Sequence, residues 1–453
     1  MKKSKYLQTI GDDNNALLFH SLKGNLFLLN KEYLQTLNSF SKARELSEEE
    51  EKSLIISELI AAAYLVNEQF DERKSIVEKN QQWMNDFETE EKIRLLDLMV
   101  SESCNFGCKH CLHSRSTMLT DSHGKKRFMD FETAKKAIDI YYQIINKLPK
   151  KISGNIHFGS AEPLLNWKVV KEACLYAKKL DNNCLLSINT NLTLLTKEQA
   201  IFFKDHNVYV STSLDGPKNG NDKIRTYKNL KGTFNDILKN IFLLQNVGHP
   251  IDGFSVTIND LNFDSINEDF VNWATEKKFK AIGTDIDLIN EDNCTKPIQT
   301  YVDKLIDIRI ACEKCGIENF GSWTTVYENL INPPEDGMPT FCKAIKGRNV
   351  AINPEGKVFL CGHTTTAINN SFTTDIFKKN STFYNVVKNR LPGNDPFCLA
   401  CPIEGVCSGQ CHITREVTTN LQSNKTKTLC DFYKTVTQQL LERKLKKELL
   451  EII

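Results

Sequence analysis

Apolar residues follow two alternating spacings through the middle of the chain. Short apolar runs rich in β-branched residues predict strands at 95–101, 154–159, 184–190, 208–214, 252–259 and 282–289. Amphipathic spacing predicts helices at 130–147, 167–180, 197–206, 233–247, 263–278 and 299–314. Six strand–helix units in succession predict an α/β fold with a parallel sheet. Because a closed eight-unit barrel takes about 250 residues, the roughly 240 here favour an open (β/α)6 barrel with its chemistry at the C-terminal strand ends.

The first 90 residues, which we call the head, follow a different pattern. Two apolar runs at 16–20 and 25–30 flank a turn at Gly24 and predict a β-hairpin. Helical patterns follow at 31–43 and at 47–65, where Ser47 to Glu50 resembles a capping box. The head is therefore predicted to be a small domain of winged-helix type, joined to the barrel by a polar, helical linker at 67–93.

Composition and charge exclude several classes of partner. Lys and Arg number 58 and Asp and Glu 57, so the net charge is +1 and favours neither nucleic acid nor an acidic membrane surface. Apolar runs are much shorter than the ~20 residues that span a bilayer, and no apolar segment follows the basic N-terminus. We expect a cytoplasmic protein without a nucleic-acid or membrane partner.

The cysteines are numerous and clustered. Of 15 in the chain, three lie between 104 and 111 and seven between 342 and 430. In a protein without a route to an oxidising compartment, such clusters indicate metal ligands. A structural zinc site needs four ligands, whereas the first loop offers three, and a zinc ribbon would use only four of the seven in the tail. Five scattered cysteines are interpreted as packing residues: Cys174, Cys184, Cys294, Cys312 and Cys315.

The first cluster follows the first predicted strand. Cys104, Cys108 and Cys111 have the spacing C-x3-C-x2-C, and three cysteines can ligate three irons of a cubane and leave the fourth open. At these residues the chain resembles the radical SAM superfamily. The resemblance implies a [4Fe–4S] cluster whose open iron binds the amino and carboxylate groups of S-adenosylmethionine (SAM). It also implies that His110, where the family usually has an aromatic residue, stacks on the adenine.

Further motifs follow the next three strands. Segment 159–163 (GSAEP) is similar to the family's GGEP motif, segment 187–191 resembles its TNG segment with Leu192 in place of Gly, and segment 211–217 followed by Arg225 resembles its SLDGP…R pattern. One such motif is weak, because Ser and Asn often form turns, but four in register on consecutive strands are specific. By resemblance, Glu162 accepts from the SAM ammonium, Ser213 reaches the ribose and Arg225 pairs with the SAM carboxylate. The expected SAM contacts are His110, Gly159, Ser160, Glu162, Ser187, Asn189, Ser213 and Arg225.

The cysteine-rich tail, residues 336–453, resembles the SPASM domain of radical SAM enzymes that modify peptides and proteins. A predicted hairpin at 350–360, turning at 354–356, places Cys361 beside Cys342. The resemblance implies two auxiliary [4Fe–4S] clusters and so three in total. Their expected ligands are Cys342, Cys361 and Cys411 for one cluster and Cys398, Cys401, Cys407 and Cys430 for the other. The first set lacks a fourth ligand, for which Cys315 or Cys312 is an alternative to a buried, unligated thiol.

The resemblance, which covers about residues 95–440, implies a peptide maturase in three parts: the head at 1–90, a radical SAM partial barrel at 91–335 and a SPASM domain at 336–453. Such an enzyme installs thioether or carbon–carbon crosslinks in a ribosomal precursor peptide and takes electrons from flavodoxin or ferredoxin. The head resembles leader-peptide recognition domains, and a purely structural brace is the alternative. A sulfatase-type maturase usually has Asp after the cysteine corresponding to Cys361, where this chain has Gly362. A non-catalytic electron carrier would have no need of Glu162, Ser213 and Arg225.

Overall fold

A computed structural model describes residues 1–89, 93–111, 127–148, 151–288, 293–335, 337–364, 366–420 and 425–452. The predicted domain boundaries at 90/91 and 335/336 touch residues outside these ranges, and the boundaries stay predictions. In the described ranges, no helix combines the length and the apolar character needed to cross a bilayer.

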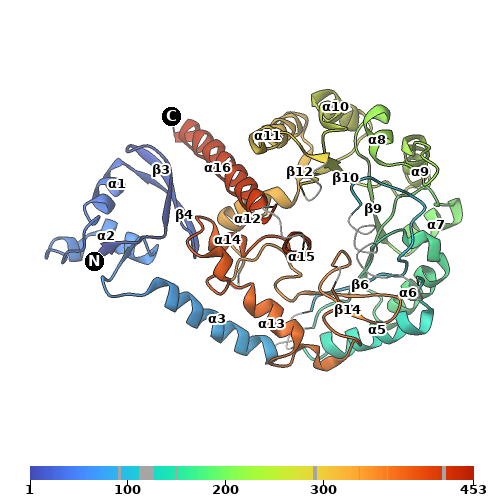
Figure 1. Ribbon diagram of the computed structural model, residues 1–453, viewed down its shortest axis with the longest axis horizontal. Coiled ribbons are helices and arrows are strands. Elements are labelled where there is room, and N and C mark those ends of the chain that lie inside the picture. Colours follow the sequence, from blue (N-terminus) through green and yellow to red (C-terminus); the bar gives the residue numbers. More distant parts are fainter. Residues whose placement is uncertain are drawn as a thin grey trace.

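The six predicted strand–helix units are confirmed. Neighbouring strands pair in parallel and in sequence order and are β6 (Leu95–Leu98), β7 (Asn155–Phe158), β8 (Leu185–Asn189), β9 (Val208–Ser213), β10 (Gly253–Ile258) and β11 (Ala281–Ile286). The helices between and after them are α5 (Phe131–Ile145), α6 (Trp167–Leu180), α7 (Lys197–Asp205), α9 (Phe234–Asn246), α10 (Glu268–Glu276) and α11 (Ile298–Cys315). They cover the outer face of the curved sheet (Figure 1). The short α8 (Lys218–Ile224) was not predicted because its polar sequence has no apolar period.

The sheet continues beyond the barrel strands at both edges. On one side β12 (Glu318–Phe320) pairs with β11, and on the other β13 (Asn349–Ile352) pairs in parallel with β6. The predicted tail hairpin is confirmed, since β13 turns through Gly356, whose φ is +79°, into antiparallel β14 (Val358–Phe359). Tail and barrel therefore share one nine-stranded sheet.

The rest of the tail consists of short helices and one long one. The short helices lie at the open side of the curved sheet, while the long α16 runs towards the head (Figure 1). Their bounds are α12 (Thr325–Ile331), α13 (Thr382–Asn389), α14 (Glu404–Cys407), α15 (His412–Asn420) and α16 (Lys425–Ile452). This arrangement brings Cys411 and Tyr433 of the tail beside the C-terminal ends of the barrel strands.

The head contains the predicted hairpin within a larger fold. Strand β2 (Leu7–Gly11) adds to the hairpin of β3 (Asn15–His20) and β4 (Gly24–Asn30), and β1 (Lys2–Lys3) pairs with β5 (Leu65–Val66). Helix α1 (Lys31–Asn38) follows β4 as predicted. The helix predicted at 47–65 is wrong in extent, because Ser47 and Glu50 cap only a 3-10 turn and Ser53 caps the shorter α2 (Leu54–Ala61).

The head packs tightly against the tail. Strand β3 is buried on both faces: Leu17 and Phe19 join the core of the barrel and tail, and Ala16 and Leu18 join a separate core of the head. The predicted linker helix is confirmed as α3 (Glu72–Thr89), and Arg73 makes a bidentate ion pair with Glu404 of α14 at 2.7–2.8 Å. Removal of the head would therefore expose apolar surface of the tail.

Candidate active site

A cavity of about 430 Å³ lies where the C-terminal strand ends meet the tail. We call one side of it the barrel wall, formed by Cys104, Cys108, His110, Cys111, Ser160, Asn189, Ser213 and Arg225. We call the other side the tail wall, formed by His363, Cys411, Ile413, Leu429, Phe432 and Tyr433. The expectation that the chemistry-bearing residues gather at the strand ends is met by this arrangement.

The three cysteines of the first loop share the barrel wall. Burial raises the pKa of Cys104 to about 11 and that of Cys108 to about 12, so each thiolate needs a nearby cation. The backbone N–H of Phe106 donates to the Sγ atom of Cys104 over 3.4 Å. Three soft thiols around a cavity fit a multi-iron cluster, whose irons supply the positive charge. In the described part of the chain, no three His, Cys, Asp or Glu side chains converge on a position for one metal ion.

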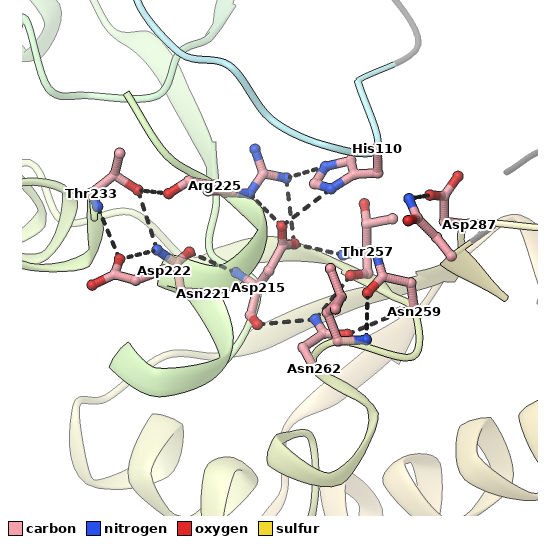
Figure 2. Close-up of polar contacts among 12 residues, drawn as sticks. His110, Asp215, Asn221, Asp222, Arg225, Thr233, Thr257, Asn259, Asn262 and Asp287 are labelled. Carbon is pink, nitrogen blue, oxygen red and sulfur yellow. Dashed lines mark hydrogen bonds and ion pairs between the residues drawn. The ribbon is translucent and has the colours of Figure 1, made fainter. Parts of the chain in front are cut away.

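Figure 2 shows how Arg225 is held beside the cysteine loop. Its Nε atom lies 2.7 Å from Oδ2 of Asp215, a fully buried carboxylate at the end of β9. Its Nη2 atom lies 3.3 Å from Nε2 of His110, and Nδ1 of His110 lies 3.7 Å from the same Asp215 oxygen. His110, expected to stack on adenine, is thus also part of a polar network with Arg225.

A second layer of polar contacts fixes this pair (Figure 2). The backbone N–H of Thr257 donates to Oδ1 of Asp215 over 2.8 Å, and the side-chain amide of Asn262 donates to its carbonyl over 3.0 Å. The hydroxyl of Thr233 donates to the carbonyl of Arg225 over 2.7 Å. Arg225 is therefore positioned by the protein's own residues, and its Nη1 atom has no hydrogen bond to any residue that the structure describes.

Glu162 is more deeply buried than its expected role requires. Its carboxylate accepts from the hydroxyl of Thr190 at 2.7 Å and from the backbone N–H groups of Asn191 at 2.8 Å and Leu164 at 2.9 Å. Burial raises the pKa of Glu162 to about 7, although these three donors lower it. A carboxylate has about four acceptor positions, so room for one more donor remains, but Glu162 does not line the cavity.

Two other expected SAM residues also lie behind the barrel wall. The hydroxyl of Ser187 is 2.8 Å from Nδ1 of His157, inside the barrel. A Cβ atom on Gly159 would come within 2.9 Å of the His157 ring, so this glycine is required by packing. The positions where Ser160 and Ala161 depart from the family motif have left-handed backbones, with φ of +66° and +36°.

The tail cysteines influence one another electrostatically in two groups. The charges of Cys411 and Cys342 both act on Cys361, and burial raises the pKa of Cys342 to about 11 and of Cys361 to about 12. The second group shows the same mutual influence among Cys398, Cys401, Cys407 and Cys430. Their assignment as ligands stays a prediction.

The proposed fourth ligands lie elsewhere. The thiol of Cys315 is 3.4 Å from the amide oxygen of Asn272 on α10, and Cys312 is fully buried on the same helix, α11. Both belong to the outer helical layer, and neither lines the cavity. Packing is therefore the better interpretation of these two thiols.

Several residues that line the cavity between the two walls carry no signal in the sequence patterns. These are Thr257, Asp285, Ile286, Asp287, Leu288 and Ser322. Strand β11 ends at Ile286, earlier than the predicted 282–289, which hid the carboxylates inside an expected strand. The rule that chemistry follows strand ends could have identified Asp287, but Ser322 and Tyr433 are brought here only by the tertiary fold.

Comparison with known proteins agrees with this geometry. Residues 98–271 match the radical SAM superfamily. The radical SAM cyclopropyl synthase TigE of Paramaledivibacter caminithermalis is 28% identical over 97% of this chain and 95% of that protein. The crystal structure of Streptococcus suis SuiB bound to precursor peptide SuiA has a TM-score of 0.54 at 12% identity, covering 94% of this chain and 97% of that one.

A third comparison extends the likeness of fold. The structure of anSMEcpe with bound AdoMet and Cp18Cys peptide has a TM-score of 0.59 at 16% identity, covering 78% of this chain and 99% of that one. The shared architecture confirms the predicted α/β fold class. The middle of the chain, with its three-cysteine loop, is therefore a radical SAM domain, and the protein is an enzyme that is similar over nearly its whole length to a radical SAM enzyme.

Proposed function

We propose that this enzyme modifies a ribosomal precursor peptide by abstracting hydrogen from a side chain and closing a carbon–carbon or thioether bond. The proposal depends on one observation. The three-cysteine loop and Cys411 of the tail line opposite sides of the same cavity. A substrate side chain in this cavity could then lose a hydrogen atom on the side of the three-cysteine loop and an electron on the side of the tail. The cyclopropyl synthase, similar over nearly the whole chain, supports a peptide-type product.

The barrel wall would hold the first cofactors. Cys104, Cys108 and Cys111 would ligate a [4Fe–4S] cluster, and Arg225 would pair with the SAM carboxylate. When bound, the cluster and SAM supply a 5′-deoxyadenosyl radical, which removes a hydrogen atom from the substrate. The protein's part is to fix Arg225 through Asp215 and to place Ser213 and Asn189 on the cavity surface.

The tail would hold two auxiliary clusters in the two cysteine groups. The side-chain amide of Gln410 donates to the Sγ atom of Cys430 over 2.7 Å, and Arg415 hydrogen-bonds to Cys398. Donors to cluster sulfurs raise the reduction potential, because they stabilise the added negative charge. These contacts suit the tail to accept an electron from the substrate, with a flavodoxin or ferredoxin as the low-potential donor to the barrel cluster.

The apolar tail wall favours an aliphatic substrate side chain. Ile413, Leu429 and Phe432 face the cavity, joined by Ile286 and Leu288 at the end of β11. Together with the similarity to a cyclopropyl synthase, this lining favours carbon–carbon closure over thioether formation. A formylglycine-forming role is less supported: the carboxylate nearest Gly362, that of Asp97, lies outside the cavity wall.

The head would bind the leader of the same peptide. In the order β2-β3-β4, strand β4 is an edge strand, and no other described element pairs with its backbone. Phe27 on this strand is 50% exposed, which offers an apolar anchor beside the free edge. An extended peptide that adds to such an edge gains backbone hydrogen bonds, and side-chain pockets give it specificity.

The test is co-expression of the enzyme with the short peptides encoded by neighbouring reading frames, followed by mass spectrometry. We expect a peptide lighter by 2 Da, because a crosslink removes two hydrogens. Anaerobically reconstituted enzyme should then form 5′-deoxyadenosine in a peptide-dependent manner. A protein that carries electrons but never cleaves SAM would contradict the proposal.

A further inference from the structure

Asp285 is a carboxylate in the cavity that has no cationic partner. It lies at the end of β11, where it lines the cavity between the barrel wall and the tail wall. Its Oδ1 atom accepts from the backbone N–H of Ser322 at 2.7 Å and from the Ser322 hydroxyl at 2.6 Å. Its Oδ2 atom has no hydrogen bond, and the carboxylate no ion pair, to any residue that the structure describes. The two oxygens therefore differ: one is anchored and one is available.

The hydrogen bonds behind Asp285 run in one direction. Because the Ser322 hydroxyl donates to Asp285, the Tyr433 hydroxyl, 3.4 Å from the Ser322 oxygen, can only donate in turn. Tyr433 is buried against Phe341 and Phe432, and burial raises its pKa well above the usual value, so it keeps its proton. Both hydroxyls thus stabilise a negative charge on Asp285 and leave Oδ2 as its proton-accepting atom.

No charged neighbour commits Asp285 to its ionised form. Thr257 is its register partner on β10, and Ser322 and Tyr433 approach from the turn after β12 and from α16. The other titratable groups around the cavity, besides the cysteines, are His110, Arg225, Asp287, His363 and Tyr433. None of these is an ion-pair partner of Asp285 within the described ranges. Burial raises the pKa of Asp285 to about 6, so at neutral pH the group is ionised and can accept a proton.

We propose that Asp285 is the catalytic base that takes the substrate proton during bond closure, with Ser322 as its positioning residue. The inference rests on the proposed function. Closing a bond between a C–H carbon and an X–H atom, where X is carbon or sulfur, removes two hydrogens from the peptide. One leaves as a hydrogen atom to the 5′-deoxyadenosyl radical. The other leaves as a proton to Oδ2 of Asp285, and the remaining electron passes to an oxidised iron–sulfur centre of the tail.

The first test separates proton removal from hydrogen-atom removal. The probe is the peptide encoded beside this chain, synthesised with deuterated aliphatic side chains and given to the holoenzyme with SAM. In Asp285→Asn, deuterium should still reach 5′-deoxyadenosine, while crosslinked peptide formed per 5′-deoxyadenosine should fall at least 100-fold, the usual minimum for loss of a general base. Asp252→Asn is the matched control, because Asp252 lies before β10 at the opposite strand end and pairs only with exposed Lys280.

The second test follows pH and needs no product from the variant. In the wild type, crosslinked peptide per 5′-deoxyadenosine should fall tenfold per pH unit below about pH 6, where Asp285 becomes protonated. Infrared difference spectra of the holoenzyme without peptide should show a carboxylic acid band that titrates near this pH and is missing in Asp285→Asn. Ser322→Ala should shift this midpoint upwards, because the ionised form loses its hydroxyl donor.

The pH dependence of the free energy of unfolding supplies a third test, and the direction of the change can be stated in advance. The folded-state pKa of Asp285 lies above its ordinary value of 3.8, so the native protein binds more protons than the unfolded chain between these two pH values. The contribution of Asp285 to stability therefore decreases as pH rises through this window. Asp285→Asn should raise the denaturation midpoint at pH 8 and have a diminishing effect towards pH 4.

Three results would overturn the assignment: an unchanged product ratio in Asp285→Asn, loss of deuterium transfer together with product, or no titrating band. Loss of deuterium transfer would show that Asp285 orients the peptide instead. If the wild type itself transfers no deuterium and forms no crosslink, the proposed function fails. The infrared and denaturation readouts would still establish whether Asp285 titrates as a cavity carboxylate.

Discussion

The two walls of the cavity differ in the side chains that they present to a ligand. On the barrel wall, Arg225 and His110 are tied to buried Asp215, so that a charged group is fixed in place before a ligand arrives. On the tail wall, Ile413, Leu429 and other apolar side chains face the cavity without such partners. A preorganised charge suits a zwitterionic cofactor that is always the same, whereas an apolar surface selects a substrate by shape and burial.

The same contrast separates two aspartates at the ends of β9 and β11, the strands on either side of β10. Asp215 follows β9 and has a guanidinium 2.7 Å away, which makes it a structural counter-ion. Asp285, one residue before the end of β11, has hydroxyl and amide donors but no cation, and burial raises its pKa to about 6 although these donors lower it. Residue type alone does not assign a role, because the partners of each carboxylate decide whether it holds a charge or exchanges a proton.

Removal of the loop cysteines should have the largest effect. The Cys104→Ala/Cys108→Ala/Cys111→Ala triple variant should lose SAM cleavage entirely, and reconstituted iron should fall from about twelve to about eight per chain if three cubanes are present. Iron analysis and 5′-deoxyadenosine assays measure both. Cys174→Ala, at a fully buried cysteine in the core, is the control and should keep its iron. A wild-type iron content near four would contradict the two tail clusters.

Loss of Arg225 should be the next largest effect. A desolvated charge pair that loses one partner costs about 2–5 kcal/mol, so Arg225→Ala should weaken SAM binding at least tenfold. Arg225→Lys should recover part of it, because an ammonium cannot reproduce the planar fork. Calorimetric SAM titrations decide the size of each change. Unchanged affinity in Arg225→Ala would remove this residue from the SAM site.

Asp215→Asn provides the matched variant for the same wall. It keeps the arginine charge but removes its counter-ion, so SAM affinity should fall less than in Arg225→Ala while thermal stability falls. Equal losses of affinity in the two variants would mean that the position of the guanidinium, and not only its charge, determines binding.

The SAM affinity should also depend on pH through Glu162. Burial raises the pKa of Glu162 to about 7, and its ionised form accepts a stronger, charge-assisted hydrogen bond from the SAM ammonium than the protonated carboxyl does. As pH falls below 7 this group takes up a proton, so affinity should decrease by up to tenfold per pH unit. Calorimetry from pH 6 to 8 measures the slope, which should be retained in Arg225→Lys and absent in Glu162→Gln. A slope that persists in Glu162→Gln would exclude Glu162 from SAM recognition.

A substitution in the head would test whether the protein also selects its peptide at a surface outside the cavity. Phe27→Ser on β4 should weaken binding of the leader segment by about fivefold, which corresponds to about 1 kcal/mol for loss of a half-exposed aromatic anchor. Fluorescence anisotropy with a labelled leader peptide measures this effect. Leu54→Ser is the control, because Leu54 is 69% exposed and belongs to helix α2 and not to the edge strand. Equal binding by wild type and Phe27→Ser would favour the head as a structural brace.

The sequence predicted the barrel well because each strand is a short apolar run bounded by polar turns. His110, Ser160, Asn189, Ser213 and Arg225, which the sequence places after strands, do line the cavity, since strand ends share one edge of a parallel sheet, while their contacts with SAM stay predictions. The sequence did not predict contacts between residues that are far apart in the chain. Ser322 lies 37 residues from Asp285 and 111 from Tyr433, so no local pattern connects them.

The head shows a second limit of sequence patterns. Strand β2 went unpredicted because its five residues, LQTIG, are half-buried or exposed and carry little apolar signal. Its position is determined by pairing with β3 and by packing against α16. The burial of β3 on both faces likewise depends on a helix more than 400 residues later in the chain.

The smallest predicted effect concerns the backbone of Ala161, a residue that lines the cavity. Ala161 has a left-handed φ of +36°, where a residue with a Cβ atom is strained and glycine is not. Ala161→Gly should therefore stabilise the protein by up to about 1 kcal/mol, although the greater freedom of glycine in the unfolded chain offsets part of this gain. Ala200→Gly, in helix α7, is the matched control and should destabilise by about 1 kcal/mol. Chemical denaturation of both variants gives the comparison. Destabilisation of similar size in both would show that Ala161 is not strained, and that the wall does not depend on a glycine-like turn.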